Sequence, residues 1–184
     1  MHFKITTKKN LYQLRFEKIK LGDTWTVGTM NRTEDGKYII YLDYDFLEEK
    51  HIVREIAHLQ ETMNLGNISL FQSSEKRFHI VGLTKLTAKE FVELMQNSSC
   101  DEAFKNVPRF YSIRNWVLRC FDKGKKEKPT YLYTIYHKTT REESNAHYKF
   151  LSIVYPELIN SIQNPDKLTI VETISYLTAE RKKE

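Results

Sequence analysis

Hydrophobic and polar residues alternate in several short runs along the chain, a pattern typical of strands with one buried face. The runs are HFKIT, TWTVGTM, KYIIYLDYDF, NISLFQ, RFHIVGLT, NWVLRCF and YLYTIYH. The polar stretch SSEK joins the fourth run to the fifth and predicts a hairpin with a connection of about four residues. A basic loop, DKGKKEKP, joins the last two.

A helical period replaces this alternation in three segments. Apolar residues recur every three or four positions over residues 48–65, which predicts a helix with Gly66 at its C-terminal cap. Thr87 and Glu90 have the spacing of a capping box and predict the start of a second helix. A third helix is expected in NAHYKFLSIVYPELI, up to Pro156.

Other segments have weaker patterns. Residues 98–112 contain Pro108 and show no clear period, so they are expected to be irregular apart from a turn near Glu102. LTIVETISYLT fits a strand or a helix, and ERKKE is expected to be a charged tail. The order of elements predicts a single α+β domain over residues 1–184, with a mixed or antiparallel sheet and packed helices.

Composition narrows the class of protein. The chain has 184 residues, of which 40% are hydrophobic and 29% charged, so collagen-like and low-complexity proteins are excluded. The net charge of +5 permits a polyanionic partner. Cys100 and Cys120 stand alone, so no disulfide framework and no zinc site is expected. Without a long apolar run or a signal-peptide core, a cytoplasmic location and no membrane contact are expected.

Two carboxylates end the apolar run at 38–42. Because strand residues two apart lie on one face, the Cβ atoms of Asp43 and Asp45 are expected to be about 6–7 Å apart. This spacing suits a pair of divalent cations held ~3.5–4 Å apart. The alternative is that both side chains face solvent, with Asp45 preparing the cap of the helix that begins near Glu48.

His79 lies inside an apolar run, directly after a turn with hydroxyl and cationic side chains. A histidine there can donate a hydrogen bond to a phosphate oxygen, and Ser74, Lys76 and Arg77 can supply further donors. The alternative is a histidine packed in the core or at its edge and hydrogen-bonded to a neighbour.

A second basic segment follows, with the cations Arg114, Arg119, Lys123, Lys125, Lys126 and Lys128. Arg114 and Arg119 are five positions apart, so they lie on opposite faces if the strand is regular. The alternative for the lysines is a solvated hairpin tip, an interpretation that suits Lys126 and Lys128.

In their order, these segments resemble the motifs of the archaeo-eukaryotic primase superfamily, which includes the primases and primase-polymerases of plasmids and mobile elements. IIYLDYDF is similar to the family's Asp-x-Asp at a strand end, which implies that Asp43 and Asp45 are metal ligands. SSEKRFHIV is similar to its serine-containing turn and strand histidine, although Arg77 stands where the family usually has a small residue. The implied nucleotide contacts are Ser74, Lys76, Arg77 and His79.

The third motif is RNWVLRCFDKGKK, which is similar to the family's arginine-rich strand and the lysine after it. The resemblance implies that the triphosphate is bound by Arg114, Arg119 and Lys123 or Lys125. The family has a third metal-binding carboxylate, for which Asp101 is the first choice and Asp122 the alternative. The resemblance covers residues 38–128, about half of the chain, and the family's zinc-binding insertion has no counterpart.

The resemblance implies a catalytic core with a modified RNA-recognition-like fold. Its activity would be nucleotidyl transfer on a single-stranded or primed DNA template, with nucleoside triphosphates as substrates and two Mg²⁺ or Mn²⁺ ions as cofactors. One ion would activate the 3′-hydroxyl group and the other would stabilise the leaving pyrophosphate. A helicase or an accessory primase domain is a further partner that the resemblance allows.

Two other functions stay open. A two-metal nuclease could use Asp43, Asp45 and His79 without a triphosphate site. An inactive replication-accessory domain could bind a single strand by charge and by stacking on Tyr131, Tyr133 and Tyr136. Tyr131 and Tyr133 are expected on one face of their strand, where core packing is the commoner role.

Overall fold

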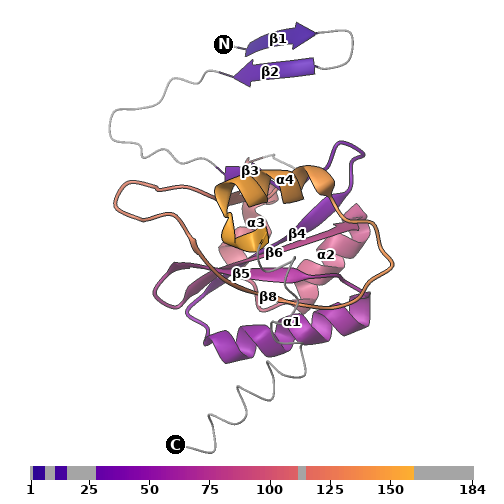
Figure 1. The fold of residues 1–184 in the computed structure, drawn as a ribbon, viewed down its shortest axis with the longest axis vertical. Helices are drawn as coiled ribbons and strands as arrows, with labels where there is room; N and C mark the ends of the chain where they lie inside the picture. Colours follow the sequence, from indigo (N-terminus) through magenta and orange to yellow (C-terminus); the bar gives the residue numbers. More distant parts are fainter. Residues whose placement is uncertain (1, 7–10, 16–27, 112–114, 160–184) are drawn as a thin grey trace, which may run out of the picture.

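The computed structural model describes residues 2–6, 11–15, 28–111 and 115–159 of the chain (Figure 1). The strands are β1 (His2–Thr6), β2 (Leu11–Arg15), β3 (Gly28–Met30), β4 (Tyr38–Asp45), β5 (Ile68–Ser74), β6 (Arg77–Leu86), β7 (Val117–Arg119) and β8 (Thr130–Ile135). The main sheet is antiparallel, with the order β4-β6-β5-β8. β1 pairs with β2 and β3 with β7, both antiparallel.

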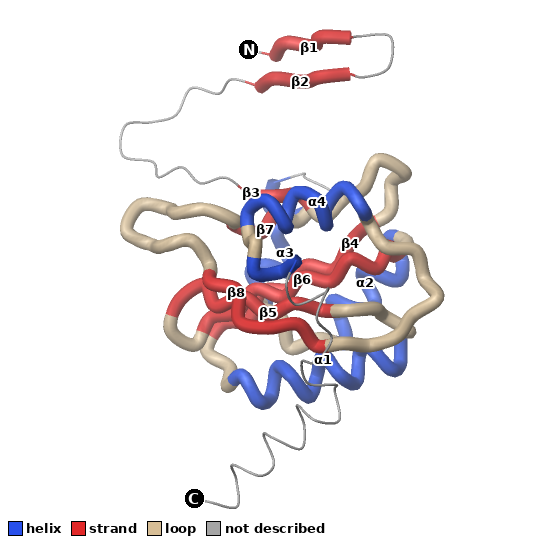
Figure 2. Tube along the Cα trace, viewed as in Figure 1, coloured by secondary structure: helices blue, strands red, loops and turns tan. Residues whose placement is uncertain are grey.

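The helices are α1 (Glu49–Met63), α2 (Ala88–Asn97), α3 (Glu102–Tyr111) and α4 (Asn145–Val154). In the view of Figure 2, α1 lies below the main sheet and α4 above it. The predicted α+β class, with an antiparallel sheet and packed helices, is confirmed.

One face of the main sheet packs on α1. Tyr44 of β4 donates a hydrogen bond to Glu55 (2.6 Å), and Tyr133 of β8 donates one to Glu49 (2.6 Å). Both carboxylates belong to α1, whose apolar side is buried at Ile52 and the positions that follow it at helical spacing. This face holds the largest part of the core.

The opposite face carries the polar ends of the strands. Asp43, His79 and Phe71 are paired in register across β4, β6 and β5, so their side chains lie on the same side of the sheet. α4 and the residues after it cover part of this face, where the rings of Phe71 and Tyr155 are 4.6 Å apart. The uncovered part leaves room for a site.

The helix ends differ from expectation in one case. Thr87 and Glu90 form the predicted capping box of α2. For α1, however, the predicted cap at Gly66 is wrong, because Asn64 takes the left-handed conformation (φ 51°) and its N–H bonds to the Gln60 carbonyl. Asparagine tolerates this conformation better than most residues, and it ends the helix two positions earlier.

The expectation of an irregular segment at 98–112 is wrong, because α3 forms there. The Asp101 carboxylate accepts a hydrogen bond from the Phe104 N–H (2.9 Å) and caps the helix. Pro108 lacks the N–H that would bond to the Phe104 carbonyl four residues earlier. The indole Nε1–H of Trp116 donates to that carbonyl instead (3.0 Å), so a distant side chain replaces the missing helical bond.

The predicted strands are confirmed with other limits: β5 and β6 extend beyond NISLFQ and RFHIVGLT, whereas β3 and β7 are shorter than expected. β2 was not predicted. β3 and β7 have three residues each, and residues 16–27, with part of TWTVGTM, lie outside the described residues. The β5–β6 connection is tighter than expected, with Glu75 and Lys76 between the strands and Lys76 at φ 53°. LTIVETISYLT and ERKKE also lie outside the described residues. None of the helices in the described ranges is long and apolar enough to span a membrane.

Candidate functional site

A cavity of about 300 Å³ opens on the uncovered face of the main sheet, beside the β3–β7 pair. Residues from β3, β4, β5, β6, β7, α3 and the β7–β8 hairpin form its wall. The predicted site residues that line it are Asp43, Asp45, Ser74, Arg77, His79, Arg119 and Lys123. Segments that are up to 80 positions apart in the sequence, from Asp43 to Lys123, therefore meet at one cavity.

The register of β4 and β6 sets the centre of this site. Asp43 is paired with His79, and Asp45 is paired with Arg77. The distance from His79 Nε2 to Asp43 Oδ1 is 3.7 Å, and that from Arg77 Nε to Asp45 Oδ1 is 3.5 Å. The prediction that the two aspartates share a face is confirmed, and each faces a nitrogen-bearing side chain on the neighbouring strand.

Asp43 is the most perturbed carboxyl group of the site. Burial, and then the charges of Asp45 and Asp101, raise its pKa to about 7, although Arg77 and Lys126 act in the opposite direction. Its backbone is fixed on both sides, because its N–H donates to Cys100 Sγ (3.3 Å) and its carbonyl accepts from the Asp101 N–H (2.7 Å). Three carboxylates thus repel one another at the end of β4.

The two candidates for a third carboxylate have different positions. Asp101 is hydrogen-bonded through its backbone to Asp43, but its carboxylate caps α3 and does not line the cavity. Asp122 lies at the base of the β7–β8 hairpin, where its carboxylate accepts from the Lys128 N–H (2.6 Å). Asp101 is therefore beside the aspartate pair, whereas Asp122 has a structural role in the hairpin.

The donor chemistry of the aspartate pair suits a hard divalent cation such as Mg²⁺ or Mn²⁺. A cation would relieve the repulsion that raises the pKa of Asp43. Among the described residues, no group of three or more His, Cys, Asp or Glu side chains is arranged around one metal position. Asp43 and Asp45 would thus hold a cation that keeps several waters, which is the usual state of protein-bound Mg²⁺.

His79 is nearly buried, with 8% of its surface exposed. Burial and the charges of Arg119 and Lys126 lower its pKa to about 4, although a hydrogen bond with the Arg119 backbone carbonyl acts in the opposite direction. The imidazole is therefore neutral at pH 7 and its contact with Asp43 is not an ion pair. The Arg119 carbonyl uses the single N–H of the neutral ring, so the other ring nitrogen can accept one hydrogen bond without adding charge.

Arg119 holds the wall of the cavity together. Its guanidinium donates to the backbone carbonyls of Ser73 (3.1 Å), Phe121 (3.0 Å) and Glu127. These bonds tie β7 and its hairpin to the end of β5. Because the partners are neutral carbonyls, the positive charge of Arg119 stays uncompensated beside the cavity.

Lys123 and Lys126 flank the hairpin turn and both line the cavity. Their backbones pair with each other (2.8 and 3.0 Å), and Gly124 takes the left-handed conformation (φ 59°) that the turn requires. Residues paired in this way point to the same side. Lys126 is exposed at the hairpin tip, as the solvated-tip interpretation expects, and it also lines the cavity. The KGKK spacing could have indicated its pairing with Lys123. Lys125 occupies the turn and does not line the cavity.

The remaining predictions have mixed outcomes. The solvated-tip interpretation is wrong for Lys128, whose Nζ donates to the Val154 carbonyl and lies 4.3 Å from the Tyr155 ring centroid. Lys76 does not line the cavity, and Arg114 lies outside the described residues.

A shared face for Tyr131 and Tyr133 is also wrong. The register of β5 and β8 shifts between Leu70 and Phe71, which are paired with Tyr133 and Tyr131. The extra residue places the two tyrosines on opposite faces: Tyr131 packs on Phe71, and Tyr133 donates to Glu49.

Searches of protein-family models, of curated proteins and of solved structures found no match to this chain. The function is therefore argued from the chemistry of the site.

Proposed function

We propose that the protein is a metal-dependent nucleotidyltransferase, a primase or polymerase core that joins nucleotides on a single-stranded or primed DNA template. The observation that carries the proposal is the division of charge in one cavity. The aspartate pair lies at the end of β4, and Arg119, Lys123 and Lys126 approach from the β7–β8 hairpin. Nucleotidyl transfer needs both kinds of group, because cations bind the triphosphate and acids hold the metal.

The acidic side of the cavity would bind the cofactor. Asp43 and Asp45 would hold Mg²⁺ or Mn²⁺, and the backbone bonds of Asp43 to Cys100 and Asp101 keep its carboxyl group in place. When bound, the divalent cations would supply the charge that lowers the pKa of a 3′-hydroxyl group and neutralises the leaving pyrophosphate. Asp101 would add negative charge next to the pair.

The basic side would bind the triphosphate. Arg119 has neutral carbonyl partners, so its charge is available to a phosphate group beside the cavity. Lys123 and Lys126 point the same way from the hairpin, and Ser74 lines the same cavity. Arg77 would bridge the two sides, because it faces Asp45 from β6.

His79 would bind the nucleotide by accepting a hydrogen bond. Burial keeps the ring neutral, and the Arg119 carbonyl uses its single N–H, so the other ring nitrogen is an acceptor. It would accept from a hydroxyl group of the nucleotide or from a water molecule bound to a phosphate group. An acceptor held in this way costs little reorganisation when the substrate binds.

The fold supports the same proposal at a coarser level. The order β4–α1–β5–β6–α2, with β6 between β4 and β5, is compatible with the βαββα part of a ferredoxin-like unit. We propose that this unit is the modified RNA-recognition-like core of one catalytic domain. DNA and nucleoside triphosphates would be its partners in the cytoplasm, with a helicase or accessory primase domain as a further partner.

Primed and unprimed single-stranded templates, incubated with nucleotides and Mn²⁺, test the proposal. The wild-type protein is compared with the double variant Asp43→Asn, Asp45→Asn and with the control Asp35→Asn, an exposed aspartate that does not line the cavity. Template-dependent products that only the double variant lacks support the transferase. Degradation of the template would indicate the nuclease, and unchanged binding without products would indicate the accessory domain.

A further inference from the structure

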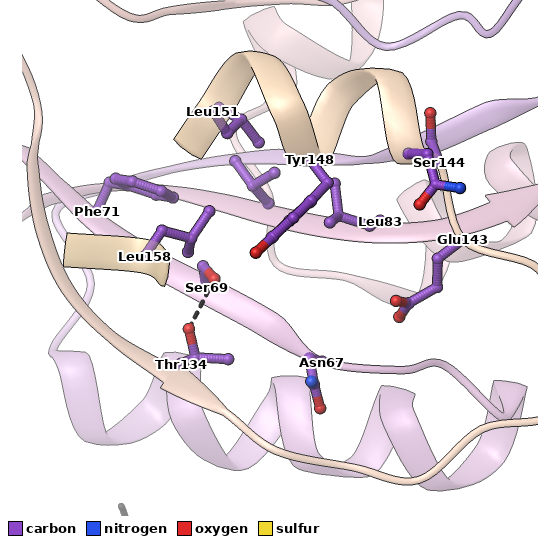
Figure 3. Close-up of a pocket in the computed structure, with 12 residues that line it drawn as sticks. Asn67, Ser69, Phe71, Leu83, Thr134, Glu143, Ser144, Tyr148, Leu151 and Leu158 are labelled. Atoms are coloured by element: carbon purple, nitrogen blue, oxygen red, sulfur yellow. Dashed lines mark hydrogen bonds between the residues drawn. The ribbon is translucent and has the colours of Figure 1, made fainter. Parts of the chain in front are cut away.

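A second cavity, also of about 300 Å³, lies on the same face of the sheet, under α4. It shares no lining residue with the candidate site, yet Phe71 in its wall is paired in register with His79. Its volume is at the lower end of the ~300–1,000 Å³ range of small-molecule pockets. The apolar part of the wall comes from Phe71, Val81, Leu83, Leu151 and Leu158, as Figure 3 shows in part.

Among the described residues, the Glu143 carboxylate is the only charged group that lines this cavity. In Figure 3 it reaches from the segment before α4 toward the space between the helix and the sheet. Within the described ranges it forms no ion pair and no hydrogen bond. Burial raises the pKa of Glu143, as expected for a carboxyl group without a cationic partner.

Gly66 makes this position of Glu143 possible. A Cβ atom at residue 66 would collide with Glu143 Oε1 and would lie 2.8 Å from Thr139 Cγ2. The bare backbone therefore lets the carboxylate lie against the chain at the cavity edge. This close approach explains a glycine at a position that does not cap α1.

Tyr148 supplies a second polar group without a partner. Figure 3 shows its ring crossing the cavity, with the hydroxyl directed toward the side where Ser69 and Thr134 bond to each other (2.8 Å). Among the described residues, the Tyr148 hydroxyl makes no hydrogen bond. No Lys, Arg or His from the part of the chain that the structure describes lines the cavity, so these residues offer no cation to an anion such as a phosphate group.

We propose that this cavity binds an unpaired nucleobase, with guanine preferred over the other bases. A planar base fits the apolar wall and can pack on the rings of Tyr148 and Phe71. A carboxylate accepts two parallel hydrogen bonds from two adjacent N–H donors. Guanine presents such a pair, its ring N–H and exocyclic amino group, whereas adenine and cytosine have no ring N–H on that edge, and in uracil and thymine carbonyls flank it.

This inference goes beyond the transferase proposal and has its own readout, because binding to this cavity requires neither metal nor catalysis. Guanosine, inosine and adenosine are titrated separately into the full chain by calorimetry. Inosine lacks only the exocyclic amino group of guanosine. We expect it to bind at least about tenfold more weakly, because one hydrogen bond to the charged Glu143 carboxylate is lost. Adenosine is expected to bind no better than inosine.

Three variants place the binding in this cavity. Glu143→Gln is expected to weaken guanosine binding about tenfold and to reduce the difference from inosine. Glu142→Gln is the matched control, because its carboxylate bonds to Lys85 and does not line the cavity. Asp43→Asn, Asp45→Asn should leave guanosine binding unchanged, which separates this proposal from the transferase.

Circular dichroism of each variant establishes that it is folded. The proposal is overturned if guanosine does not bind, if adenosine binds equally well, or if folded Glu143→Gln binds guanosine like the wild type.

Discussion

His79 Nε2 lies 3.7 Å from Asp43 Oδ1 across β4 and β6, and the protein shifts the pKa values of these two side chains in opposite directions. Burial raises the pKa of Asp43 to about 7 and lowers that of His79 to about 4. Both shifts favour the neutral form, since each charged form loses hydration. The negative charge of the Asp43 carboxylate is therefore poorly neutralised until a cation binds.

Asp43→Asn is expected to stabilise the folded protein above pH 7. The raised pKa means that the folded state binds more protons than the unfolded state between about pH 4 and 7, so the Asp43 side chain lowers stability as the pH rises through that window. Removing the charge should raise the free energy of unfolding by about 1–3 kcal/mol at pH 8, with little effect at pH 4. Thermal unfolding at the two pH values measures this, with Asp35→Asn as control; a loss of stability at pH 8 would contradict it.

Divalent cations are expected to stabilise the protein more at high pH than at low pH. A metal ligand must be deprotonated, so Mn²⁺ competes with the proton on Asp43. The increase in Tm caused by Mn²⁺ should be larger at pH 8 than at pH 5.5 and should disappear in Asp43→Asn, Asp45→Asn. A shift in Tm that is equal at both pH values, or that survives in the double variant, would place the metal elsewhere.

Lys126→Ala is expected to weaken nucleoside triphosphate binding by about three- to tenfold, because it removes one charge that lines the cavity. Lys125→Ala is the matched control, since its side chain belongs to the same exposed hairpin but does not line the cavity. Fluorescence titration with a labelled nucleotide compares the two. Equal losses in both variants would show that only the total charge of the hairpin matters.

His79→Ala is expected to reduce kcat/KM for the nucleotide by about tenfold or more, because a buried hydrogen-bond acceptor for the nucleotide is lost. The histidine is already neutral above about pH 4. The wild-type rate should therefore show no change near pH 6.5 that arises from titration of His79. A pH–rate profile of both proteins checks this. A wild-type step near pH 6.5 that is lost in His79→Ala would mean that the ring acts as a cation.

Trp116→Phe is expected to destabilise the protein by about 1–2 kcal/mol, because it leaves the Phe104 carbonyl without a donor in α3. Pro108→Ala restores a backbone N–H four residues after Phe104. The loss caused by Trp116→Phe should therefore be smaller when Pro108→Ala is present. Urea unfolding of the wild type, the two single variants and the double variant gives the coupling energy between positions 108 and 116. Strictly additive effects would contradict this account of α3.

Part of the centre of the site could be predicted from the sequence because strand geometry is regular. Alternation places Asp43 and Asp45 on one face, a relationship between neighbours along the chain. The pairing of His79 with Asp43 joins β4 to β6, which are separated in the sequence by α1 and β5. In the sequence, only the family resemblance brought His79 to the aspartate pair.

The rest depends on tertiary contacts that the local pattern does not show. α3 forms around Pro108 because Trp116 supplies the missing donor, and it thereby carries Asp101 to the backbone of Asp43. The register shift that separates Tyr131 from Tyr133 arises in the pairing with β5. Such effects need the positions of partners that are far away in the sequence.

The most direct test of the central claim is single-nucleotide incorporation on a primed DNA template with Mn²⁺, with the next template base varied. We expect the wild-type protein and Asp35→Asn to add the complementary nucleotide to the primer, and Asp43→Asn, Asp45→Asn to add none. Incorporation by the folded double variant at the wild-type rate, or no incorporation by the wild-type protein at any template base, would contradict the assignment of Asp43 and Asp45 to nucleotidyl transfer.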